Sequence, residues 1–110
     1  MRLPFCENAV ADIRKLTEYL LNPNHKDGKH KARLFKAALN LTAKDAEPLR
    51  LALLEAVKIN DAILGKADRF GQRYTVDFRY EWQDRSATLR SGWIIEDESE
   101  IPRLTTCYPL

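Results

Sequence analysis

The feature that most constrains the fold is a change in the spacing of apolar residues near Asn60. Before this point apolar side chains recur every three or four residues, which is typical of amphipathic helices. After it, the segment RYTVDFRYEW (73–82) alternates between apolar and polar residues. A period of two places successive side chains on opposite faces of a strand. We therefore expect helices first, followed by a sheet with one buried face.

Three helices are predicted before Asn60. The first is short, and Asp12 serves as its N-cap. It carries apolar residues at helical spacing, namely Ile13, Leu16, Tyr19 and Leu20. The loop 22–28 ends it, because this segment contains a proline, a glycine and several Asn and Asp residues.

The second helix is predicted from about Gly28 to Asn40, with Asp27 as its candidate cap. The third covers about 46–60. Its start follows the usual preferences, because Thr42 and Asp45 have capping-box spacing and Pro48 falls in the first turn.

Four strands are predicted after Asn60, at about 61–70, 73–82, 86–95 and 102–109. The short segment WQDRS (82–86) favours a hairpin between the second and third of them. Pro102 and Pro109 restrict the last strand to an edge or a strand end, because proline cannot donate to a sheet ladder. The prediction is one α+β domain, residues 1–110, with three N-terminal helices packed on one face of an antiparallel sheet of about four strands.

The charges are distributed unevenly, although the net charge is only +2. Residues 25–36 contain five cations, both histidines and a single acid, whereas 96–100 contains four acids in five residues. A basic surface region and an acidic loop are therefore expected.

No segment resembles a targeting signal or a membrane span, so we expect a complete cytoplasmic protein without membrane contact. Cys6 and Cys107 are then expected to be reduced thiols. The chain contains no CxxC, HExxH, P-loop or GxGxxG motif. We therefore expect no cofactor and no metal site.

The start of the second helix is unusual, because cations lie at the end where the helix dipole disfavours them. With about 100° per residue and His30 set at zero, Leu34, Ala38 and Phe35 define an apolar face centred near about 90°. Lys31 falls inside this face and His30 at its edge. The stripe on the opposite side, Lys29, Arg33 and Lys36, is typical of a solvated helix face, and the alternative is that its cations bind an anion.

Two interpretations of Lys31 follow. Its stem packs on the core while its ammonium reaches solvent past the helix end, or it points over the sheet into a cleft and binds a phosphate together with the first helical turn. Tyr108 and Thr106 share an alternation with Leu104, so they either complete the core face or belong to a site.

The segments KLTEYLLNPNHKDGKHKARLFKAAL and GWIIEDESEIPRLTTCYP resemble a family of small bacterial proteins described as a domain of unknown function, some of them labelled adhesin. A basic helix followed by an antiparallel sheet and a final TTCYP strand is similar, more weakly, to the superfamily of small metal-independent ribonucleases that unites barnase, EndoU, colicin-type tRNases and RelE-like toxins.

The second resemblance implies a toxin-type endoribonuclease that cleaves RNA by attack of the ribose 2′-OH on the adjacent phosphate. His30 would be the general base, and Lys31 and Arg33 would stabilise charge on the phosphorane. Tyr108 or Thr106 would position the phosphate. The remaining predicted substrate-binding residues are Lys29 and Thr105.

Two other functions stay open. The protein is either an antitoxin or immunity-type module whose acidic segment, Glu96–Glu100, covers a basic target, or a non-catalytic RNA-binding domain that uses the basic helix alone. In the toxin case, a cognate antitoxin or immunity protein is the expected partner beside RNA.

Overall fold

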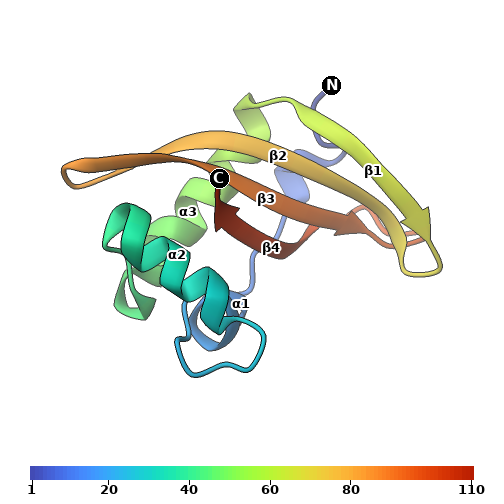
Figure 1. Ribbon diagram of the computed structural model, residues 1–110. Helices are drawn as coiled ribbons and strands as arrows, with labels where there is room; N and C mark the ends of the chain where they lie inside the picture. Colours follow the sequence, from blue (N-terminus) through green and yellow to red (C-terminus); the bar gives the residue numbers. More distant parts are fainter.

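The computed structural model describes residues 1–110 and has the predicted α+β architecture, in which an antiparallel sheet arches over the helices (Figure 1). The helical elements are η1 (Cys6–Asn8), α1 (Ile13–Lys15), η2 (Leu16–Leu20), α2 (Lys29–Leu39), η3 (Ala43–Asp45) and α3 (Ala46–Ile59). The strands are β1 (Ala62–Asp68), β2 (Gly71–Trp82), β3 (Arg85–Ile95) and β4 (Arg103–Pro109). No helix is long and apolar enough to cross a bilayer.

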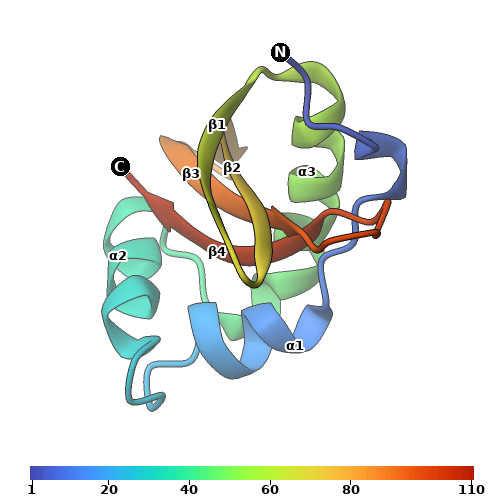
Figure 2. The same cartoon turned by 90° about the vertical axis from the view of Figure 1, so that its right-hand side faces the viewer.

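The four strands form a meander in which each strand pairs with the next one in sequence, all antiparallel. A two-residue turn, Gln83 and Asp84, joins β2 to β3 as the hairpin prediction required, and Gln83 has φ 54°. β4 is an edge strand, as its prolines predicted. Beneath the sheet α1 lies between α2 and α3 (Figure 2).

The first predicted helix is present but is not a regular α-helix. Asp12 caps it by accepting the backbone N–H of Arg14. After one α-helical turn the chain widens into a π-helix, η2, in which the Leu21 N–H donates to the Leu16 carbonyl at 2.8 Å. Two further short helices, η1 and η3, were not predicted as separate elements. The capping box of Thr42 and Asp45 is present and opens η3, which runs into α3.

Two details of the α2 prediction were wrong. Asp27 does not cap the helix, because Gly28 occupies the N-cap position without a side-chain hydrogen bond. The buried face is also rotated from the predicted one. Its buried residues are Ala32, Phe35 and Leu39, whereas Leu34 is 47% exposed. With His30 set at zero, these three residues centre the buried face at about 170°, and the predicted face was centred at about 90°.

The core lies between the helices and one face of the sheet. On β2 the predicted inward residues Tyr74, Val76 and Phe78 are buried. Trp93 of β3 is fully buried, and its indole N–H donates to Ser91 Oγ at 2.9 Å. Ser91 in turn donates to the Val76 carbonyl at 2.7 Å, so this buried polar group is satisfied.

A β-bulge in β4 decides which face its side chains occupy. Gly92 pairs with Thr106 and Trp93 pairs with Leu104, so Thr105 is the extra residue. Leu104 and Cys107 therefore both belong to the core. Thr106 and Tyr108 are half-buried and lie on the other face, which excludes the interpretation that they complete the core face.

Candidate functional site

Lys31 lies among aromatic side chains from two other elements. Its Nζ donates to the Tyr19 hydroxyl at 3.3 Å. It is 5.5 Å from the centroid of the Tyr19 ring and 5.9 Å from that of Tyr108 on β4. Lys31 is half-buried and has no carboxylate within 4.0 Å. Its ammonium therefore lies near the terminal strand, as the second interpretation of Lys31 expected for its position. We call Tyr19, Lys31 and Tyr108 the Tyr–Lys–Tyr cluster.

The loop before α2 packs directly against Tyr19, with Gly28 at the point of closest approach. Gly28 is buried, and a Cβ there would lie 2.0 Å from the Tyr19 carbonyl oxygen, so only glycine fits without movement. His25 orders the loop before α2 without capping the helix itself. Its Nδ1 accepts the backbone N–H groups of Asp27 and Gly28, both at 2.9 Å. The His25 ring also packs edge-on against Tyr19, with centroids 5.0 Å apart.

A row of polar residues extends the cluster across the sheet. Asp77, Arg90 and Tyr108 are direct cross-strand neighbours on β2, β3 and β4, on the face turned away from the core. Arg90 donates to both carboxylate oxygens of Asp77, at 2.9 and 2.8 Å. This hydrogen bonding lowers the pKa of Asp77 and raises that of Arg90. Arg90 is thus a second cation beside Tyr108, and its guanidinium is held in place on the neighbouring strand β3.

Thr106 contributes an unsatisfied polar atom on the same face. Its Oγ1 is buried and has no hydrogen-bond partner. Gly92 allows this packing, because a Cβ at that position would meet Thr106 Cγ2 at 2.9 Å and Thr105 Oγ1 at 3.0 Å. A buried hydroxyl without a partner is uncommon in proteins and marks a position where a further acceptor or donor would be favourable.

The predicted basic residues of α2 do not all lie together. His30 is exposed on the first turn and has no side-chain hydrogen bond. Arg33 is about 200° around the helix from Lys31, and it lines a separate hollow together with Lys29. The structure thus brings Lys31 and Tyr108 together and places Lys29 and Arg33 on the other side of α2.

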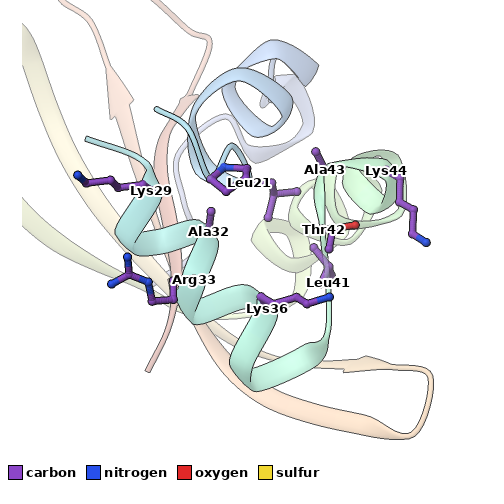
Figure 3. A pocket seen from close by; sticks show the side chains of 10 residues that line it. Leu21, Lys29, Ala32, Arg33, Lys36, Leu41, Thr42, Ala43 and Lys44 are labelled. Carbon is purple, nitrogen blue, oxygen red and sulfur yellow. The ribbon is translucent and has the colours of Figure 1, made fainter. Parts of the chain in front are cut away.

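This hollow lies between α2 and the segment 41–44 and has a volume of about 550 Å³. Its lining is apolar at the centre and basic around the rim (Figure 3). The apolar lining residues are Leu21, Pro23, Ala32, Leu41 and Ala43, and the basic ones are Lys29, Arg33, Lys36 and Lys44. No acidic residue lines it. We call it the basic hollow.

The cations around α2 share one property, which is that none has a carboxylate partner. All seven Lys and Arg residues between positions 15 and 44 lack a carboxylate within 4.0 Å, whereas eight of the eleven others form an ion pair. The seven are Lys15, Lys26, Lys29, Lys31, Arg33, Lys36 and Lys44. The positive potential of this region is therefore not compensated within the protein.

The acidic segment, Glu96–Glu100, contains one residue with an ion-pair partner, unlike the cations around α2. Glu96 pairs with Arg103 of β4, and the other acids of Glu96–Glu100 are exposed and unpaired. The structure contains no group of three or more His, Cys, Asp or Glu side chains arranged to hold a metal ion.

The family model described as Domain of unknown function (DUF6883) matches residues 2–110. The chain belongs to this family. The predicted resemblance to a domain-of-unknown-function family is thus confirmed, and the DUF6883 match spans both the basic helix and the terminal strand. No curated protein and no solved structure matched the chain. The comparisons give no support to the weaker resemblance to the ribonuclease superfamily, which stays a prediction.

Sequence reasoning missed four residues of this region. Tyr19 and Arg90 gave no signal, because their neighbours come from distant parts of the chain. Lys36 shares a helix face with Lys29 and Arg33, and that stripe was the available signal, although it was interpreted as solvated surface. Lys44 reaches the same hollow from the segment after α2.

Proposed function

We propose that this member of the DUF6883 family binds RNA through the cations around α2 and cleaves it without a metal. A ribose 2′-OH would attack the adjacent phosphate and displace the 5′-oxygen of the next nucleotide, leaving a 2′,3′-cyclic phosphate and a free 5′-hydroxyl. The observation that carries the proposal is the set of seven cations without carboxylate partners. Backbone phosphates are the main source of affinity in protein–nucleic acid complexes, and they pair with Lys and Arg. RNA would supply the missing negative charge.

The start of α2 adds to this argument. Its first turn contains no acidic residue, so the helix dipole and the side chains are positive at the same place. An anion bound there is stabilised both by the helix dipole and by the basic side chains. Helix N-termini commonly bind phosphate groups for the first of these reasons. The chain does place acids at other helix starts, such as Glu47 in the first turn of α3.

The Tyr–Lys–Tyr cluster is the proposed place of cleavage. Lys31 would stabilise the charge that develops on the phosphorane, because its ammonium is held by aromatic rings and a hydroxyl and is not neutralised by a carboxylate. Tyr108 would position the phosphate by hydrogen bonding. The alternative residue Thr106 is not proposed for this role, because its Oγ1 is buried.

His30 is the proposed general base. It lies next to Lys31 on the exposed part of the first turn, where an imidazole can reach a 2′-OH of a bound strand. Arg33 is proposed to bind RNA and not to contact the reacting phosphate, since it projects from the other side of α2. This changes its role from the one that the sequence suggested.

The test is an incubation of purified protein with total RNA in the presence of a chelator, followed by analysis of the fragments. We expect fragments from the parent protein, and loss of cleavage in Lys31→Met and His30→Ala. Arg79→Met is the matched control, because Arg79 is an exposed cation of β2 without a carboxylate partner and lies outside both sites. RNA binding without any fragments would indicate a non-catalytic RNA-binding domain, and no binding at all would refute the proposal.

A further inference from the structure

We infer that the basic hollow receives the base of an unpaired nucleotide, so that the RNA recognised by this protein is single-stranded. This inference rests on the proposed function and adds the class of substrate. It concerns a site on the opposite side of α2 from the Tyr–Lys–Tyr cluster. The two sites can therefore be tested separately.

The size and the lining of the hollow suit a flat, largely apolar group. Its volume of about 550 Å³ lies within the range of roughly 300–1,000 Å³ that is typical of small-molecule sites. Pro23 is exposed and Ala43 half-buried, so these two lining residues offer apolar surface to a ligand, and Leu21, Ala32 and Leu41 are buried beneath them. A base that leaves its stack needs such a surface to replace the contacts that it gives up.

The charges lie where the phosphates flanking such a base would remain. Lys36 extends from α2 towards Leu41, whereas Lys29, Arg33 and Lys44 direct their charged ends outwards (Figure 3). Arg33 has a planar guanidinium that can stack on a base. The arrangement combines an apolar interior with a positive rim, which matches a nucleotide whose base is enclosed and whose phosphates stay at the surface.

The cations continue from the hollow towards the proposed cleavage place, which favours a polymer over a small anionic ligand. Around the exposed side of α2 the basic side chains follow in the order Lys36, Lys29, Arg33, His30 and Lys31, over an arc of about 220°. A strand that placed one base in the hollow and crossed the first turns of α2 would pass His30 before it reached Lys31.

A duplex cannot use this site in the same way. Its bases are paired and stacked, and protein contacts are made mainly to phosphates and 2′-hydroxyls along the minor groove. Duplex RNA would therefore bind only through charge, and filling the hollow would leave its affinity unchanged. Single-stranded RNA would lose the contact made by the enclosed base.

The experiment compares the binding of two probes that cannot be cleaved by 2′-OH attack, namely a short 2′-O-methyl RNA strand and its duplex with the complementary strand. The test variant Ala43→Leu fills the hollow and keeps every cation. The matched control is Ala37→Leu, because Ala37 is exposed on α2 and does not line the hollow. A second filling variant, Pro23→Leu, covers the case in which the first one fails to fold, since Pro23 is an exposed lining residue and leucine adds no aromatic ring on which a base could stack.

We expect both filling variants to weaken single-strand binding about fivefold or more, because the base would lose the apolar surface that it buries in the hollow. Duplex binding and the Ala37→Leu control should match the parent. Equal weakening of both probes, or no weakening of either, would overturn the inference, and the proposed function would still stand if Lys31→Met abolished cleavage. A parent protein that bound neither probe would overturn both.

Discussion

Lys31→Met tests whether the cation at the start of α2 serves stability or RNA. The replacement keeps an unbranched, flexible side chain of similar length and removes the charge. It abolishes the 3.3 Å hydrogen bond to the Tyr19 hydroxyl. It also removes the cation–π contacts with the rings of Tyr19 and Tyr108.

The stability terms nearly cancel. The lost hydrogen bond destabilises the variant by about 1 kcal/mol, and the lost cation–π contacts by about 0.5–1 kcal/mol at a half-exposed site. Removing a positive charge from a helix N-terminus gains about 0.3–1 kcal/mol, and a methionine sulfur against the same rings gains about 0.3–1.5 kcal/mol. The free energy of unfolding should therefore stay within about 1 kcal/mol of the parent, which corresponds to a shift in Tm of about 4 °C or less.

The effect on cleavage should be much larger. A group that stabilises transition-state charge contributes about 10²–10³ in rate. Thermal melts and RNA cleavage rates measured on the same samples separate the two effects. Lys29→Met is the control for the dipole, because Lys29 lies in the same turn and has no aromatic contact or ion pair. It should be slightly more stable than the parent. Because Lys29 is itself one of the proposed RNA-binding cations, Arg79→Met remains the control for the cleavage rate. If Lys31→Met lost more than about 2 kcal/mol of stability but cleaved RNA at the parental rate, Lys31 would be a structural residue.

Three further results are expected. Burial raises the pKa of the Cys107 thiol, so a thiol reagent should modify the half-buried Cys6 in the native protein and reach Cys107 only after unfolding; fast modification of both would contradict this. Gly28→Ala should lower Tm and weaken cleavage together, because the added Cβ would push the start of α2 off the backbone beneath it; an unchanged Tm would refute this packing. Because Arg90 lowers the pKa of Asp77, the pair stabilises the fold above the ordinary pKa of an aspartate and loses this contribution as the pH falls through the folded pKa. Asp77→Asn should thus have a lower free energy of unfolding than the parent at pH 7. In acid, below the folded pKa of Asp77, the two free energies should converge, and urea titrations at pH 7 and in acid would measure both.

The order and type of the main elements could be predicted from the sequence, because periodicity reports directly on local geometry. The alternation of 73–82 arises from the pleat of a strand, and it correctly assigned Tyr74, Val76 and Phe78 to the core. Caps are equally local, which is why Asp12 and the Thr42–Asp45 pair were found.

The errors came from features in which one residue changes the geometry of those after it. The extra residue Thr105 inverts the alternation of β4, so Leu104 and Cys107 share a face although their spacing is odd. The π-helix at Leu16–Leu20 likewise widens a turn that the sequence presents as regular. Neither carries a composition signal, because both are settled by packing against other elements.

The candidate site could be predicted only as far as it is local. The basic start of α2 was visible, and so was the approach of Lys31 to the sheet. Its contact with Tyr19 and Tyr108 required the turn at Gly28 and the bulge at Thr105, which together bring three distant segments to one place.

The position of these cations in the fold explains how the helix tolerates them. α2 begins without an acidic cap, and its start is instead held by packing and by backbone hydrogen bonds, including the Lys29 N–H to the His25 carbonyl at 3.0 Å. This support does not depend on charge, so it leaves the first turn free to be positive. A carboxylate cap would have stabilised the helix by itself, but it would also have neutralised the place where Lys31 meets Tyr108. In the proposed function a phosphate of the RNA takes the position that a capping carboxylate has in other helices, and the adverse dipole term becomes favourable when RNA binds.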